Sequence, residues 1–170
     1  AFISYSHADE SWARWLHKAL ETYRIPKRLV QKYKLPSNRL IPIFRDRDEL
    51  ASSGNLSDVI QDAMANSEYL IVICSRHSAQ SRWVNEEIRK FKMLGHSDKV
   101  LCLLIDEPES SFPPSTLVEF NSSGEQISDN LEPLAADARQ GFDGKAMAKL
   151  KIIAGLINVG LDELIRRDAN

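Results

Sequence analysis

The sequence lacks the usual motifs by which a protein grips a nucleotide phosphate or a catalytic metal. It contains neither G-x-G-x-x-G nor G-x-x-x-x-G-K-[ST], which excludes the two commonest glycine-rich phosphate loops. It has no H-E-x-x-H, no closely spaced cysteine pair and no histidine cluster, so it predicts no zinc site. No G-x-S-x-G presents a serine nucleophile. Any functional residues must therefore be sought outside these known cofactor, metal and nucleophile motifs.

Long apolar runs, cysteines and net charge are scarce as well. The longest apolar runs, residues 69–74 and 100–105, are too short to span a bilayer, and no secretory leader is visible. Cys74 and Cys102 lie inside these runs and are predicted to be buried, reduced thiols. A formal net charge of -2 gives no electrostatic reason to expect a nucleic-acid or anionic-membrane partner. We expect a cytoplasmic protein with neither partner.

What is present suffices for one folded domain. The chain has 170 residues, of which 43% are hydrophobic and 27% charged, so it can bury a core. It starts directly with an apolar, strand-like segment and no lead-in. We therefore expect residues 1–170 to form a single soluble domain excised from a longer chain.

Strand-like and helix-like segments alternate along the sequence. Buried strands are expected at short β-branched apolar runs, and helices where apolar residues recur every three to four positions. The predicted strands are residues 2–6, 40–44, 69–74 and 100–105. The predicted helices are residues 9–23, 56–65, 82–94, 143–157 and 161–167. Residues 26–36 are expected to be irregular, and residues 107–141 to be mostly loops, with a short fifth strand that the pattern does not place.

This alternation predicts an α/β fold with a central parallel sheet of four to five strands and helices on both faces. In such folds the ligand crevice lies at the carboxyl ends of the strands. The segments that follow the predicted strands, and so meet at that edge, are residues 5–7, 45–46, 75–77 and 106–107.

One carboxylate falls among apolar residues on the helix predicted over residues 82–94. At about 100° per residue, with Val84 at zero, Glu87 lies near 300°, between Leu94 and Phe91. Glu86 lies near 200°, on the polar side. Burying a carboxylate at position 87 costs free energy unless it has hydrogen-bond partners. One interpretation is therefore a structural glutamate that accepts such hydrogen bonds. The other is a site carboxylate, because perturbed acids beside a crevice are enriched at active sites.

Five motifs in order resemble those of bacterial TIR domains. They are residues 2–6 (FISYS), residues 43–46 (IFRD), Gly54 in a polar loop, residues 71–75 (IVICS) and residues 81–88, which read S-x-W-x-x-x-E-I. The resemblance covers roughly residues 1–106. It implies a flavodoxin-like three-layer fold with a mobile loop at residues 45–55.

The resemblance also implies a site. The glutamate four residues after the tryptophan, here Glu87, matches the catalytic residue of TIR enzymes that cleave NAD+ between nicotinamide and ribose. The positions that match the border of the substrate site are Tyr5, Ser6, Phe44, Arg45 and Trp83. The positions that match the self-association loop are Asp46, Asp48 and Gly54.

Three functions remain open. The first is an NAD+ nucleosidase of bacterial antiviral defence, which takes NAD+ as a substrate and uses no cofactor or metal. Its product is open: linear ADP-ribose, cyclic ADP-ribose or another base-exchanged nucleotide. Its partners would be further TIR domains, through self-association, and a fused or partner sensor domain. The second is a non-catalytic TIR interaction module in signalling or a host-directed virulence adaptor. The third is another flavodoxin-like domain, such as a receiver or a nucleoside-transferring enzyme. The glutamate at position 87 favours the first.

Overall fold

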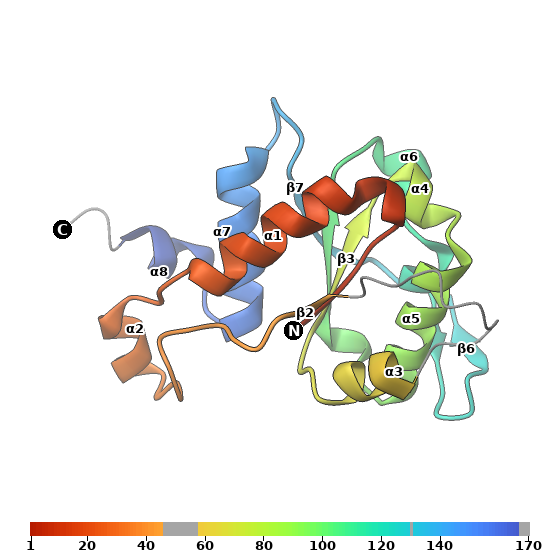
Figure 1. Cartoon of the computed structure of the whole chain (residues 1–170), viewed down its shortest axis with the longest axis horizontal. Coiled ribbons are helices and arrows are strands. Elements are labelled where there is room, and N and C mark those ends of the chain that lie inside the picture. The colour runs from red at the N-terminus through yellow and green to blue at the C-terminus, as the bar shows by residue number, and fades with distance from the viewer. Residues whose placement is uncertain (46–57, 130, 167–170) are drawn as a thin grey trace.

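A five-stranded parallel sheet forms the middle layer of the protein (Figure 1). The computed structural model describes residues 1–45, 58–129 and 131–166. The strand order is β2-β1-β3-β4-β7, and every neighbouring pair in this sheet is parallel. The strands are β1 (Phe2–Ser4), β2 (Phe44–Arg45), β3 (Leu70–Cys74), β4 (Val100–Leu104) and β7 (Leu134–Asp137). This is the predicted flavodoxin-like α/β fold.

Helices cover both faces of the sheet, as predicted (Figure 1). One face packs against α1 (Glu10–Thr22), α2 (Lys27–Lys32), α7 (Gly144–Ile157) and α8 (Leu161–Arg166). The other packs against α3 (Asp58–Ala65) and α5 (Arg82–Met93). The short elements are η1 (His7–Asp9), α4 (Arg76–Ala79), η2 (Ser97–Lys99), α6 (Pro108–Ser111) and η3 (Pro114–Thr116).

Alternation of side chains along the strands divides the core into two layers. In β1, Ile3 joins the cluster under α1 and α7, whereas Phe2 joins the cluster under α5. The same division runs through β3 and β4, because successive side chains of a strand point to opposite faces. The free cysteines Cys74 and Cys102 both lie buried in the layer under α5, as the sequence predicts.

Two predictions for the chain between these elements were wrong. The strand expected at residues 40–44 is reduced to β2, because Pro42 has no backbone N–H for a ladder and pairing starts only at Phe44. Residues 26–36 are not irregular, since α2 begins directly after Pro26 and buries Leu29 in the core. Residues 107–141 are mostly loops with a fifth strand, as predicted, and they also contain a separate antiparallel pair, β5 (Glu119–Phe120) with β6 (Gln126–Ser128).

The fifth strand, β7, closes the parallel sheet beside β4. Its first two residues, Leu134 and Ala135, are exposed and only Ala136 is fully buried. A strand so short and exposed has no apolar run or clear alternation, which is why the sequence pattern does not place it.

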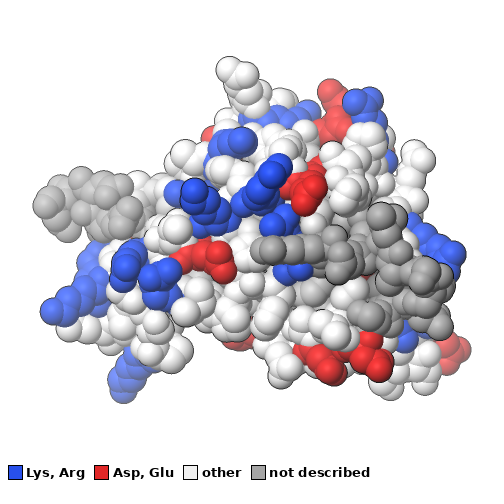
Figure 2. Space-filling model, in the orientation of Figure 1, with Lys and Arg blue, Asp and Glu red and all other residues white. Residues whose placement is uncertain are grey.

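Basic and acidic side chains are unevenly distributed on the face shown in Figure 2. Lysine and arginine side chains gather at the end of the molecule that contains α2 and over α1, while acidic side chains line the edge at α3. Part of the basic end is neutralised, since Glu163 of α8 accepts from Lys32 at 3.1 Å and also from the Tyr33 hydroxyl. In the part of the chain that the structure describes, no helix is both long and apolar enough to cross a membrane.

Candidate functional site

Glu87 is almost completely enclosed, with 2% of its surface exposed. It lies on α5, between Val84 and Phe91, both of which are fully buried in the core layer. The hydroxyl of Ser4, the last residue of β1, donates a hydrogen bond of 2.6 Å to Glu87 Oε1. The burial predicted from helical periodicity is therefore confirmed, and one hydrogen bond joins this carboxylate to the carboxyl end of the sheet.

Local sequence signals set the position of α5. Ser81 caps its first turn by accepting from the Val84 N–H at 3.2 Å. Its last turn ends at Gly95, which has φ of 89° and donates from its N–H to the Lys92 carbonyl at 3.0 Å. Glycine suits this left-handed position because it lacks Cβ. These two caps define where the helix begins and ends, and its apolar side, with Val84, Ile88 and Phe91, packs against the sheet.

The neighbouring glutamate has a different environment. Glu86 is half-buried and forms an ion pair of 2.9 Å with Arg89 on the same helix. Arg89 is further held by the Gly124 carbonyl at 3.0 Å. Glu86 thus belongs to the surface of α5 rather than to the core, as its place on the helical wheel indicates.

Two of the aromatic residues expected at the site lie in the same layer as Glu87. Phe44 and Trp83 are both partly buried and pack against the apolar cluster that contains Val84 and Ile88. Trp83 lies one turn before Glu87, and the guanidinium of Arg82 stands 5.9 Å from its ring centroid. The structure therefore brings a carboxylate and two aromatic rings into one layer of the fold.

Tyr5 and Arg45 fall on the other side of the sheet. Tyr5 packs into the core under α1 and α7, and the Arg45 guanidinium stands 5.8 Å from its ring centroid. Arg45 also donates to His17 Nδ1 at 3.3 Å and lies 3.8 Å from Glu10, both on α1. Because strand residues alternate between faces, these two side chains are separated from Phe44 and Glu87 by the sheet.

The remaining expected residues have local or undescribed positions. Ser6 is half-exposed and caps η1, since its hydroxyl accepts from the Ala8 N–H at 3.4 Å. Asp46, Asp48 and Gly54 lie outside the described residues. Among the described residues, no group of three or more His, Cys, Asp and Glu side chains is arranged to hold a metal ion.

Sequence reasoning missed Ser4 as a partner of Glu87. The signal is period two: Ser4 is two residues after Phe2 in a fully buried strand, so it must face the same layer as Phe2. A hydroxyl in that layer needs a partner, and the one carboxylate predicted there is Glu87.

A second buried acid occupies the centre of the carboxyl edge. Asp9 accepts a short hydrogen bond of 2.5 Å from the Ser75 hydroxyl at the end of β3. Burial raises the pKa of Asp9, and the Ser75 hydrogen bond and nearby His77 oppose that rise. On the same edge, hydrogen bonds from the Glu107 and Arg76 backbone N–H groups lower the pKa of Asp106. Ser75 and Asp9 thus tie β3 to the start of α1.

The fold and the buried carboxylate define a flavodoxin-like α/β domain whose α5 layer contains a buried acid, with two aromatic side chains packed against the same layer. A family model described as TIR domain matches residues 1–135. The chain therefore belongs to the TIR domain family.

Two relatives are of interest. The chain is 35% identical over 102 residues to the NAD(+) hydrolase ApTIR of an Actinoplanes species, a match that covers 59% of this chain and 13% of the relative. Among solved structures, it is similar to the TIR domains of the activated Roq1 resistosome that recognises the effector XopQ. That likeness has a TM-score of 0.39 at 21% identity and covers 61% of this chain and 55% of the other.

Proposed function

We propose that this TIR domain cleaves NAD+ between nicotinamide and ribose, with Glu87 as the catalytic carboxylate. The observation that carries the proposal is the buried acid on α5, held by Ser4 at the carboxyl end of β1 and accompanied by Trp83 and Phe44. The NAD(+) hydrolase named above supports the choice of substrate, although this chain spans only 13% of its length.

The reaction suits a site with one acid and no metal motif. Nicotinamide is attached to the ribose as a cationic pyridinium and leaves as a neutral molecule, so its departure needs no general acid. The ribosyl group left behind develops oxocarbenium character, as in glycoside cleavage. A preorganised carboxylate such as Glu87 stabilises that positive charge. Trp83 or Phe44 supplies an aromatic face for the nicotinamide ring.

The burial of Glu87 sets a condition on this mechanism. A side chain that is 2% exposed cannot touch a dinucleotide until the groups covering it move. Opening of this kind costs free energy, and contacts with a neighbouring TIR domain could supply it. We therefore propose that the domain acts as an assembly-activated effector of bacterial antiviral defence, with weak activity as a monomer.

The test is release of nicotinamide from NAD+, measured by chromatography, for the wild-type chain and Glu87→Gln. The amide keeps the shape and the Ser4 contact but removes the negative charge, so we expect the rate to fall by about 100-fold or more. Glu86→Gln is the matched control, because Glu86 is adjacent in sequence and lies on the surface of the helix. Its rate should stay within about threefold of wild type.

Two results would contradict parts of the proposal. Undiminished release by Glu87→Gln would remove Glu87 from the catalytic role while leaving NAD+ cleavage in place. No release by the wild-type chain at any protein concentration would remove the activity itself. The buried Glu87 and its bond to Ser4 would then be structural, and the domain would act as a TIR interaction module.

A further inference from the structure

A cavity of about 520 Å³ opens on the sheet face opposite Glu87. It lies beside the carboxyl ends of β4 and β7, the edge at which α/β folds bind ligands. Its volume falls within the range of small-molecule sites. The residues that line it are Trp12, Ile105, Ala138, Arg139, Gln140, Gly144 and Lys145. They come from α1, from the ends of two strands and from the start of α7.

Both charged residues that line this cavity are basic, although Arg139 is paired with Asp137 and lies 3.8 Å from Glu107. Arg139 and Lys145 line it, and no carboxylate does so among the described residues. Asp137 partly offsets Arg139 by accepting from two of its nitrogens, Nε at 3.0 Å and a terminal nitrogen at 2.8 Å. The same two bonds fix the guanidinium in place. Charge complementarity therefore favours an anionic ligand.

Of the two cations that line the cavity, Lys145 is the one with no carboxylate partner among the described residues. Its ammonium stands 4.7 Å from the centroid of the Trp12 ring and 5.1 Å from that of Trp15. The two indoles are themselves packed edge to face, with centroids 5.8 Å apart. Cation–π contacts hold the ammonium without taking up its charge as a carboxylate would, so Lys145 remains able to pair with a bound anion.

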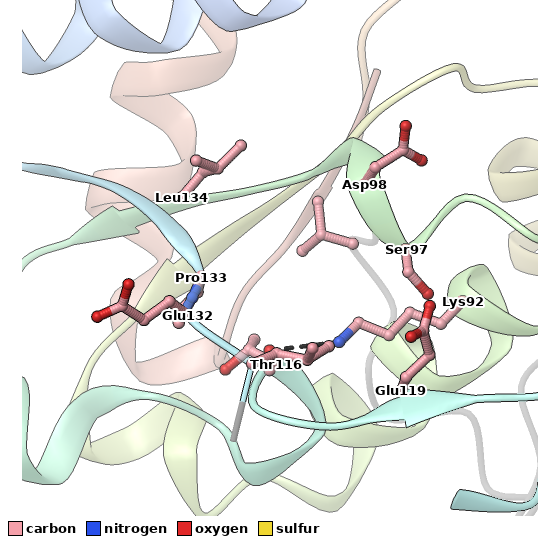
Figure 3. Close-up of a pocket in the computed structure, with 10 residues that line it drawn as sticks. Lys92, Ser97, Asp98, Thr116, Glu119, Glu132, Pro133 and Leu134 are labelled. Atoms are coloured by element: carbon pink, nitrogen blue, oxygen red, sulfur yellow. Dashed lines mark hydrogen bonds between the residues drawn. The ribbon is translucent and has the colours of Figure 1, made fainter. Parts of the chain in front are cut away.

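A second cavity shows the opposite arrangement (Figure 3). This space, of about 270 Å³, contains Lys92 but also Asp98, Glu119 and Glu132. Lys92 Nζ donates to three backbone carbonyls, those of Ser115, Thr116 and Val118, which uses all three of its hydrogens. Lys92 therefore stabilises the fold by binding backbone, and the acids around it repel an anionic ligand.

We propose that the 520 Å³ cavity is a binding site for a phosphate monoester of mononucleotide size. At neutral pH a phosphate monoester carries about −1.5 to −2 charges, so it pairs with Lys145 more strongly than a carboxylate does. Its three acceptor oxygens also suit the Arg139 N–H groups that Asp137 does not use. The apolar wall made by Trp12, Ile105 and Ala138 accommodates an organic ring, which inorganic phosphate lacks. This site is independent of Glu87 and of NAD+ cleavage.

The experiment is a titration of the whole chain with adenosine 5′-monophosphate, followed by NMR of the tryptophan indole N–H signals. The chain contains three tryptophans, and they mark different places: Trp12 and Trp15 report on this cavity, and Trp83 on the Glu87 layer. We expect saturable shifts of Trp12 and Trp15 and none of Trp83. Lys145→Gln should weaken binding by about tenfold or more. Lys149→Gln, one turn later on α7 and outside the cavity lining, should not.

The control ligands separate the sources of affinity. Adenosine has the ring without the charge and should bind at least about tenfold more weakly than the monophosphate. Inorganic phosphate that binds as tightly as the nucleotide would overturn the proposed ligand class. Equal binding of adenosine, equal effects of the two lysine variants, or shifts confined to Trp83 would overturn the site. None of these readouts depends on nicotinamide release, so the two proposals fail separately.

Discussion

Ser4 and Glu87 form the contact on which the candidate site rests. A carboxylate buried at this depth needs donors, and the Ser4 hydroxyl is one at 2.6 Å. We expect Ser4→Ala to lower the free energy of unfolding by about 1.5–3 kcal/mol, because the charged acceptor stays buried after its donor is removed. Urea unfolding followed by circular dichroism measures this.

The matched control for Ser4 is Ser67, another buried serine. Its hydroxyl donates to the Ala63 carbonyl at 2.7 Å, so Ser67→Ala removes a hydrogen bond to a neutral acceptor and should cost about 1 kcal/mol. An equal or smaller loss for Ser4→Ala would show that Glu87 does not depend on Ser4.

Asp9 makes the stability of the domain depend on pH. Burial raises its pKa in the folded state, so between the unfolded and folded values the native chain binds more protons than the unfolded one. Its contribution to stability is then lost as pH rises from about 4, the ordinary value for aspartate, through the raised folded value. We expect the difference in unfolding free energy between Asp9→Asn and wild type to change in favour of the variant as pH rises from 4 to 7.

Urea midpoints at the two pH values test the prediction for Asp9. The comparison with Asp137→Asn gives the opposite sign, because hydrogen bonds from Arg139 lower the pKa of Asp137. Asp137 stabilises the fold above its unfolded pKa, and that stabilisation disappears as pH falls from about 4 through its folded value. The urea midpoints for Asp137→Asn are therefore measured below pH 4 as well. Parallel pH profiles for the two variants would contradict both assignments.

At the scale of elements, Lys92 connects α5 to the segment that follows α6. Its Nζ donates to carbonyls of residues 115, 116 and 118, and burial lowers its pKa. Lys92→Met fills similar volume but leaves those carbonyls without a donor. We expect a loss of about 3 kcal/mol in unfolding free energy and faster hydrogen exchange at the Thr116 and Leu117 amides.

Lys90→Met is the control for that element, because Lys90 is only half-buried on the same helix. It should change stability by less than about 0.5 kcal/mol. Unchanged exchange at Thr116 in Lys92→Met would mean that this segment is held by its own turn hydrogen bonds, such as Thr116 N–H to the Pro113 carbonyl at 2.9 Å.

The elements that periodicity and apolar runs could predict are the ones that bury a continuous face. β3 and β4 are buried along their whole length, and α5 presents one apolar side. The sequence pattern did not place β7 or α2, because each element buries only one residue. The site has a related limit. The helical wheel placed Glu87, but its bond to Ser4 joins residues 83 positions apart, so it follows only when the alternation along β1 is combined with the wheel of α5.

At the scale of the whole molecule, the sheet separates two sets of candidate residues. Glu87, Phe44 and Trp83 belong to the layer under α5, whereas Tyr5 and Arg45 belong to the layer under α1. Alternation along β1 and β2 produces this division, and motif order alone could not reveal it. A single copy therefore gathers only part of the expected substrate site around Glu87.

An incomplete and buried site predicts that activity depends on protein concentration. If neighbouring TIR domains open or complete the site, nicotinamide release per molecule should rise with concentration and then level off as assembly saturates. The sharper form of the experiment adds Glu87→Gln protein to a fixed, low concentration of wild type. The variant supplies surfaces for assembly but no catalytic charge, so it should increase the total rate. A rate strictly proportional to wild-type concentration, and unchanged by added Glu87→Gln, would show that one copy opens and completes its own site.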